Sequence, residues 1–167
     1  HNLRGYLGDS LFRQAMNTIQ VNNAFSTLDA AGFRDAIEAS TGKDMDAFFD
    51  AWVFAPGFSV FTVEAMTSNA DGSSWDVELV VRQLLRATSA YHLDVPVDVT
   101  LIGANNERYD TLMTVSNSLS LLTLECPFQP VMAVLNGRNR LNQARLDHER
   151  FLYPGQNLTG TLPHVDF

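Results

Sequence analysis

The spacing of hydrophobic positions changes once along the chain. In residues 1–57 apolar side chains recur every three or four positions, which is typical of helices, whereas residues 58–136 alternate apolar and polar positions, as strands do. The change falls near Pro56-Gly57, a pair that favours a turn. We therefore expect an α+β fold, in which a short helical bundle segment precedes an antiparallel β-sandwich.

Four helices are predicted in the first part, each with one apolar face. Their inward positions are Leu3, Tyr6 and Leu7; Leu11, Phe12, Ala15, Met16 and Ile19; Phe33, Ala36 and Ile37; and Met45, Phe48, Phe49, Trp52 and Val53. The predicted N-caps are Asp9 for the second helix, Ser26 or Thr27 for the third and Asp44 for the fourth. Gly8 and Gly42 are expected to end the first and third helices.

Six short strands with turn signals between them predict the sandwich. The clearest alternation is in Val77-Leu79-Val81 and in Leu93 to Leu101, and further strands are expected at 58–67, 107–115, 118–126 and 130–136. Asp71-Gly72, Asn105-Asn106, Ser116-Asn117 and Asn136-Gly137 supply the turns. Because Pro96 lacks an N–H, its strand should lie at an edge or have that position facing away from the ladder.

The charge and composition of the chain exclude several classes of function. A net charge of −8, with Lys43 the single lysine, argues against non-specific binding of nucleic acid and against attraction to an anionic membrane. No apolar run reaches the ~20 residues that a membrane span needs. Cys126 is alone, so an intrachain disulfide is impossible, and we interpret it as a buried thiol. Since the chain begins with His1 in a helical pattern, we expect a piece of a longer protein.

Motifs for catalysis are not found in the sequence. His148-Glu149 starts like the zinc motif H-E-x-x-H, but Leu152 occupies the second histidine position. The carboxylates of Asp44, Asp46 and Asp50 are interpreted as the solvated face of a helix, and Asn157-Leu158-Thr159 as a chance sequon. There is no G-x-S-x-G elbow and no phosphate-binding glycine loop. We predict no catalytic, cofactor-binding or metal-binding residue in this chain.

Two stretches of the sequence resemble one family. Leu3-Arg4-Gly5-Tyr6-Leu7-Gly8, then Thr27, then Ser40 to Trp52 (STGKDMDAFFDAW) and Ala55-Pro56-Gly57-Phe58 follow the order seen downstream of the active site in aminopeptidase N-type zinc metallopeptidases, the gluzincin group that includes membrane alanyl aminopeptidase. There a helix ends in Y-L-G, a Thr opens the next helix, and a G-x-d-l-x-x-F-F-x-x-W segment leads into a P-G turn. Ser59 departs from the pattern, because Pro is common at that position.

The second half resembles the same family more loosely. Val81-Arg82-Gln83, the strand around Pro96 and the segment Val134 to Ala144 are similar to the β-sandwich domain that follows the catalytic domain. The resemblance implies an α+β organisation with a helical catalytic-domain end at 1–57, a sandwich domain at 58–150 and an irregular tail at 151–167.

The resemblance also implies what the chain does not carry. Family members hold one zinc through H-E-x-x-H and a further Glu, and remove N-terminal residues from peptides. In the family, all of these residues precede the Y-L-G helix end: the zinc ligands, the catalytic Glu and the Tyr that stabilises the oxyanion. The resemblance therefore assigns no catalytic role to Tyr6. The expected partners are therefore the rest of a catalytic domain and, for the parent enzyme, zinc and a peptide substrate. By the same analogy the protein is expected to be secreted or periplasmic.

Two further hypotheses remain open from the sequence. One is a non-catalytic module that binds a protein or carbohydrate, from a relative without a zinc centre. The other is an independent hydrolase that uses Ser and His in an arrangement not visible in the spacing. In the leading hypothesis this chain is inactive alone, supports the catalytic residues from behind, and exposes an apolar helical face that meets the rest of the enzyme.

Overall fold

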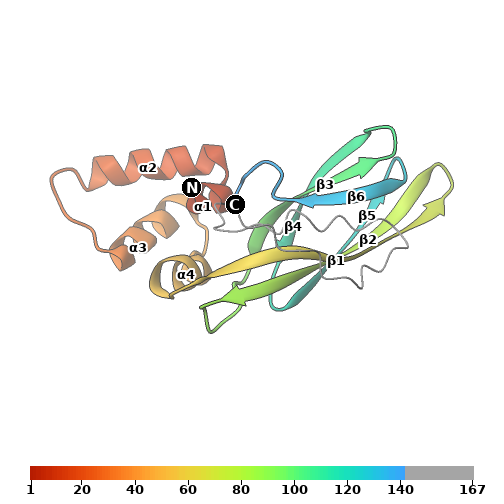
Figure 1. The fold of residues 1–167 in the computed structure, drawn as a ribbon. Coiled ribbons are helices and arrows are strands. Elements are labelled where there is room, and N and C mark those ends of the chain that lie inside the picture. Colours follow the sequence, from red (N-terminus) through yellow and green to blue (C-terminus); the bar gives the residue numbers. More distant parts are fainter. Residues whose placement is uncertain (142–167) are drawn as a thin grey trace, which may run out of the picture.

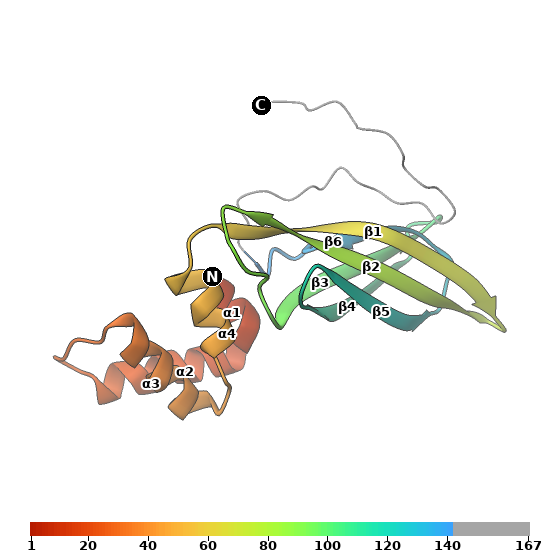
Figure 2. The ribbon, with the colours of Figure 1, turned by 90° about the horizontal axis from the view of Figure 1, so that it is seen from below.

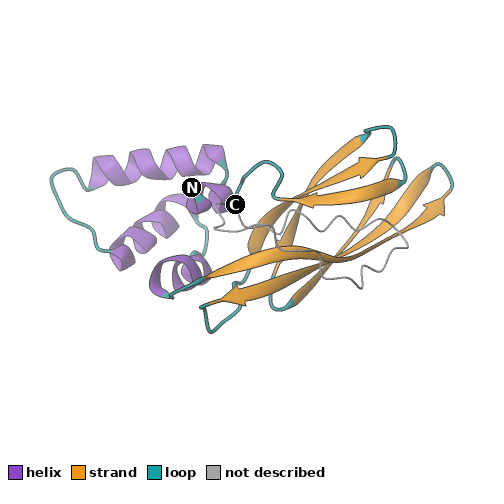
Figure 3. Ribbon diagram, viewed as in Figure 1, coloured by secondary structure: helices purple, strands orange, loops and turns teal. Residues whose placement is uncertain are grey.

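The computed structural model describes residues 1–141 of the 167-residue chain. Helices lie at one end of a β-sandwich, as the two views in Figures 1 and 2 and the colouring in Figure 3 show. The α+β architecture predicted from the hydrophobic periodicity is confirmed. None of the helices in the described part of the chain is long and apolar enough to cross a membrane.

The helical part contains α1 (Asn2–Leu7), α2 (Asp9–Asn22), α3 (Ala30–Thr41), α4 (Asp46–Phe49) and the π-helical turn η1 (Asp50–Phe54). Its core is formed by side chains that are spaced three or four positions apart on these helices, so that each helix turns one face inward. The buried members are Leu7, Ile19, Ile37, Met45, Phe48 and Phe49.

Three predicted caps are wrong. Gly8, not Asp9, is the N-cap of α2, because the Asp9 carboxylate pairs with Arg4 instead. Asp29, not Ser26 or Thr27, caps α3 by accepting a hydrogen bond from the Gly32 N–H.

The third wrong cap is that of α4, whose N-cap residue is Met45. Asp44 lies just before it and accepts a hydrogen bond from the Asp46 N–H. The left-handed Gly42 ends α3 as predicted.

The fourth helix also differs from the prediction at its C-terminal end. A continuous α-helix would bury Val53, but the helix widens into η1 at Asp50, and a π turn rotates the residues that follow it. Val53 is consequently 45% exposed, and Trp52 lies half-buried at the edge of the helical core.

Six antiparallel strands form two three-stranded sheets. They are β1 (Phe58–Asp71), β2 (Ser74–Arg86), β3 (Val95–Gly103), β4 (Arg108–Val115), β5 (Leu119–Cys126) and β6 (Pro130–Leu135). The strand orders are β1-β2-β5 and β4-β3-β6. The inward-facing residues of both sheets, among them Val77, Leu79, Val97 and Leu101, form the sandwich core.

Pro96 is accommodated although β3 is the central strand of its sheet. β6 pairs only with Val99–Gly103, so at Pro96 the β3 strand is paired with β4 alone. Of the two predicted alternatives, an edge position for the whole strand is wrong, whereas one side of the strand is unpaired at Pro96 itself.

Gly57 connects the helices to β1 and is required there. Its φ of 82° lies in the left-handed region, and an added Cβ would be 2.4 Å from the backbone of Arg86 and Ala87. Glycine alone meets both conditions. The entry of the chain into the sandwich is thus packed directly against the end of β2.

Candidate functional site

Side-chain hydrogen bonds between residues far apart in the sequence gather where the helices meet the sandwich. Tyr6 of α1 packs against both hydrophobic cores. Trp52 donates a hydrogen bond from Nε1 to the Tyr6 hydroxyl (2.9 Å), and its ring meets His92 edge-on, with ring centroids 4.5 Å apart. Burial raises the pKa of the Tyr6 hydroxyl well above its usual range. Tyr6 therefore stays neutral and acts as a packing and hydrogen-bonding residue.

Gln83 organises the sandwich loops at this junction. Its Oε1 accepts hydrogen bonds from the Ser59 hydroxyl (2.7 Å) and the His92 N–H (2.7 Å). Its Nε2 donates to the carbonyl oxygens of His92 and Asn117, both at 3.0 Å. The buried amide thus uses two donors and two acceptors, which is its full capacity. One side chain of β2 thereby joins the start of β1, the loop before β3 and the turn before β5.

His92, whose main chain is bound by Gln83, has a buried side chain. The residue is 1% exposed, and neither ring nitrogen has a hydrogen-bond partner among the described residues. Burial without a partner penalises the charged form, so the pKa of the imidazole is lowered from its usual value. The neutral ring serves as an aromatic contact for Trp52.

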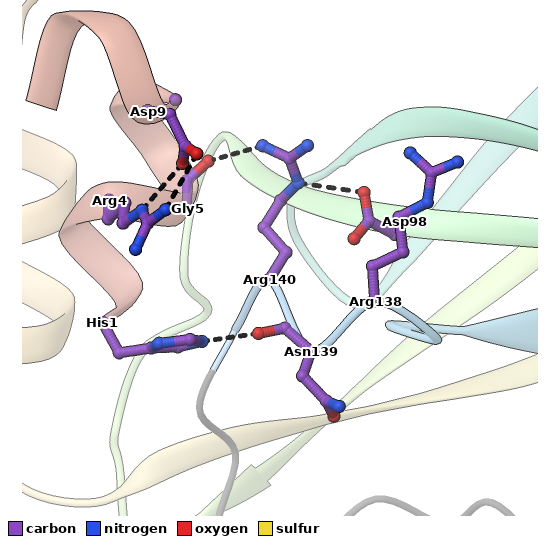
Figure 4. A pocket seen from close by; sticks show the side chains of 9 residues that line it. His1, Arg4, Gly5, Asp9, Asp98, Arg138, Asn139 and Arg140 are labelled. Atoms are coloured by element: carbon purple, nitrogen blue, oxygen red, sulfur yellow. Dashed lines mark hydrogen bonds and ion pairs between the residues drawn. The ribbon is translucent and has the colours of Figure 1, made fainter.

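A polar pocket of about 500 Å³ lies between α1 and the segment after β6 (Figure 4). It is lined by His1, Arg4, Gly5, Gly8, Asp9, Asp98, Arg138, Asn139 and Arg140. Its charges are paired. Arg4 holds Asp9 through two hydrogen bonds of 2.7 and 2.8 Å, which lowers the pKa of the Asp9 carboxyl. The His1 ring lies against the Asn139 carbonyl oxygen.

Arg140 is the central residue of this pocket. Its Nε donates to Asp98 Oδ1 (2.9 Å) on β3 and its Nη1 to the Gly5 carbonyl oxygen (3.0 Å) on α1. The side chain of Asp98 is 7% exposed, and its Oδ2 is buried without a hydrogen-bond partner among the described residues. Gly5 allows the close approach, because a Cβ there would lie 2.5 Å from the Arg140 carbonyl oxygen. The paired charges fasten α1 to the sandwich.

A second, apolar pocket of about 400 Å³ lies on the helical part, and His1 lines both pockets. Its lining is mostly aromatic and aliphatic: His1, Asn2, Leu3, Ala30, Phe33, Phe48, Phe49, Trp52 and Val53. Exposed apolar surface of this kind marks an interaction site more often than an isolated exposed side chain does. That this surface meets the rest of a catalytic domain, as expected from the sequence, stays a prediction.

The described residues do not fit a zinc site. Within residues 1–141, the carboxylates of Glu38, Asp44 and Asp46 alone bring three ligand atoms within 4.8 Å of one another. They already serve local structure, since Glu38 accepts from the Met45 N–H and Asp46 pairs with Arg34. Zinc in proteins favours histidine and cysteine ligands, which this group lacks. That the chain binds no metal or cofactor and carries no catalytic residue remains a prediction.

The remaining candidates from the sequence are Cys126 and residues that follow position 141. Cys126 is buried in β5, and burial raises the pKa of its thiol, which fits the predicted structural role. His148-Glu149, Leu152, Asn157 and the predicted tail at 151–167 lie outside the described residues. The sequence interpretation missed Gln83 and Arg140 as junction residues. A glutamine continuing the inward alternation of Val77, Leu79 and Val81 was the available signal for the first.

Comparison with known proteins finds similarity to aminopeptidases, in sequence over part of the chain and in fold. No family model matches the sequence. A stretch of 66 residues, 40% of this chain, is 27% identical to aminopeptidase N of Lactococcus lactis subsp. lactis. The fold over 81% of the chain matches part of the crystal structure of Legionella pneumophila aminopeptidase A in complex with aspartic acid, with a TM-score of 0.65 and 17% identity.

The matches cover small parts of these two proteins. The chain spans 8% of the Lactococcus aminopeptidase N and 15% of the Legionella aminopeptidase A chain. The chain is therefore distantly similar to aminopeptidase N over part of its length, and shares the fold of one portion of aminopeptidase A. No catalytic function follows for this chain from either comparison.

Proposed function

We propose that this chain is the supporting part of a zinc-dependent aminopeptidase and is inactive by itself. In this proposal the helices form the wall behind a peptidase site whose zinc and catalytic residues lie elsewhere in a longer polypeptide. The sandwich braces that wall through the Tyr6–Trp52–His92 contacts and the Arg140 pairs. Catalysis needs its groups held to within ~0.5 Å, and such support is supplied by packed elements behind the site.

The observation that carries the proposal is the apolar pocket on the helical part. Half-buried Phe33 and Trp52 line it together with the exposed Val53 and the buried Phe48 and Phe49. When a partner covers such a surface, the complex is stabilised by roughly 25 cal/mol per Å² of apolar area buried. The similarity to aminopeptidases supports the remainder of a catalytic domain as that partner.

A substitution at Val53 tests this directly. Val53→Asp places a charge on the pocket rim, and in the present chain it should leave thermal unfolding nearly unchanged, because Val53 is solvent-exposed. In the longer protein the same change should lower the unfolding temperature and the rate of aminopeptidase turnover. Val21→Asp on α2 is the matched control, since Val21 is exposed and lies outside the pocket. Equal effects of the two variants in the longer protein would contradict the proposal.

Activity and gene context give two independent tests. The purified chain should not cleave aminoacyl-p-nitroanilides, with or without added zinc, and turnover that resists a chelator would overturn the proposal in favour of an independent hydrolase. The reading frame upstream of His1 should encode an H-E-x-x-H motif. Its absence would favour a non-catalytic binding module.

A further inference from the structure

The outer face of the β1-β2-β5 sheet has carboxylates at one end, which we call the acidic half. The other end, which we call the apolar half, has leucines beside the Arg82–Glu64 ion pair. Residues that are directly opposite in an antiparallel pair lie on the same face. On this basis Asp76 and Glu125 form one row, followed by Glu78 with Thr123, Val80 with Leu121, and Arg82 with Leu119. The carboxylates therefore gather toward the β1–β2 turn and the leucines toward the helices (Figure 1).

No basic side chain among residues 1–141 pairs with the acidic half. Asp76, Glu78 and Glu125 are exposed and make no ion pair with any residue in the described part of the chain. Asp76 and Glu125 are direct cross-strand partners. Like charges in that relationship destabilise a sheet, so a basic group that binds next to them relieves the repulsion.

The apolar half lies along an unpaired strand edge. Within residues 1–141, β5 is the last strand of its sheet and pairs with β2 on one side only. Leu121 is 62% exposed and Leu119 is 47% exposed. The sequence of β5, LSLLTLEC, contains no lysine or proline. These are the residues by which proteins usually protect an edge from pairing with another chain.

We propose that β5 accepts an extended segment of a partner protein as a fourth strand, with basic residues at one end and aliphatic residues at the other. In an antiparallel addition, Lys or Arg of the segment lies opposite Glu125, and Val or Leu lies opposite Leu121 and Leu119. Main-chain hydrogen bonds supply affinity and the alternating side chains supply specificity, as in other cases of strand addition. This inference does not depend on the proposed role in an aminopeptidase.

Charge favours a basic partner over a second copy of this chain. The net charge of −8 opposes self-association. In a symmetric β5–β5 pair centred on Leu122, Glu125 would lie opposite Leu119 of the other copy, so no carboxylate would gain a positive neighbour. A basic segment satisfies the acidic row and covers the leucines at the same time.

Peptide binding to the full 167-residue chain tests the proposal. The probe is a fluorescein-labelled peptide as long as β5, 8 residues. Every second residue is Thr. The residues between them, which face outward, are Lys, Lys, Val and Val in order from the N-terminus. We expect saturable binding by fluorescence anisotropy. A peptide with the same residues but with N-methylated backbone amides on alternate residues should not bind, because strand addition needs those N–H groups.

Variants locate the site. Leu121→Lys and Glu125→Lys should each weaken binding about tenfold, which corresponds to ~1.4 kcal/mol. Leu112→Lys is the matched control, since Leu112 is an exposed leucine on β4, the edge strand of the other sheet. It should leave the affinity unchanged, and circular dichroism should show all three variants folded.

Four outcomes would overturn the proposal. They are absence of saturable binding, equal binding of the N-methylated peptide, equal weakening by Leu112→Lys, and a dimer of the chain alone that Leu121→Lys dissociates. The last outcome would assign the β5 edge to a second copy of the chain.

Discussion

The indole Nε1 of Trp52 donates a 2.9 Å hydrogen bond to the hydroxyl of Tyr6, across 46 positions of sequence. The two residues come from the last and the first turns of the helical part, and Tyr6 also contacts the sandwich core. This bond closes the helical segment on itself at the point where it meets the strands.

Substitutions of this pair should destabilise the chain to different extents. Tyr6→Phe removes the acceptor and leaves the indole N–H half-buried, at a cost of about 1 kcal/mol. Trp52→Ala also removes packing against His92 and the helical core, and we expect about 3 kcal/mol, the low end for a tryptophan because its side chain is only half-buried. Urea unfolding measures both. Tyr91→Phe, at an exposed tyrosine, is the control, and a cost from it equal to that of Tyr6→Phe would argue against the hydrogen bond.

Gln83→Ala should be costly because the amide satisfies four groups at once. The Ser59 hydroxyl, the His92 N–H and the carbonyls of His92 and Asn117 lose their partner. A buried polar group left unsatisfied costs about 1–3 kcal/mol, so we expect a total above ~2 kcal/mol. Gln20→Ala, at an exposed position of α2, should be near neutral in the same urea titration. If the two variants unfold at the same urea concentration, the network contributes nothing.

His92 should make stability depend on pH below neutrality. The folded state lowers the pKa of the imidazole, whereas the unfolded chain titrates near pH ~6.5. Above that pH both states are neutral at this residue. As the pH falls below it, the unfolded state takes up a proton that the folded state does not, so stability decreases until the folded-state pKa is reached. The Trp52 indole lies against the ring, the Gln83 amide holds the main chain of His92, and burial of the ring is the cause of the shift.

The measurement for His92 is the free energy of unfolding between pH 7 and 5, where the usual carboxyl pKa values are too low to dominate. The wild-type chain should lose stability across this interval, and His92→Leu should flatten the curve. Curves of equal slope for the two chains would show that His92 does not carry the effect.

Arg140 should matter far more than the neighbouring Arg138. Arg140→Ala leaves the buried Asp98 carboxylate without its cation, and breaking a buried pair on one side costs about 3–5 kcal/mol. Arg138 pairs with Asp110 at the surface, where an ion pair contributes about 0–1 kcal/mol, so Arg138→Ala is the matched control. Thermal unfolding compares the variants. Adding Asp98→Asn to Arg140→Ala should recover part of the loss, and no recovery would contradict a charge-based cause.

Much of the fold is predictable because its signals are local. The alternation around Val77, Leu79 and Val81 defines β2 without reference to any other strand, and the left-handed Gly42 marks a helix end that only glycine forms easily. The cap of α3 was misplaced because Ser26, Thr27 and Asp29 are all good N-cap residues. Their competition is decided by how the connecting loop folds.

The junction could not be predicted from the sequence. Arg140 contacts the Gly5 carbonyl across 135 positions, and no periodicity encodes a contact between an arginine after the last strand and a glycine in the first helix. The π turn at Asp50–Phe54 is hidden for a related reason, since its residues have the same hydrophobic spacing as an α-helix. The pattern of Trp52 and Val53 indicated a helix correctly, and only the packed structure shows which of the two is covered.

The strand order has one consequence for engineering the protein. β1 leaves the Gly57 turn, and β6 ends just before the segment that carries Arg140, so the chain enters and leaves the sandwich at the same end. The β1–β2, β3–β4 and β5–β6 connections all lie at the opposite tip (Figure 1). Peptide tags or reporter sequences inserted at that tip would extend away from the helices, so the tip offers three attachment points that leave the anchoring end undisturbed.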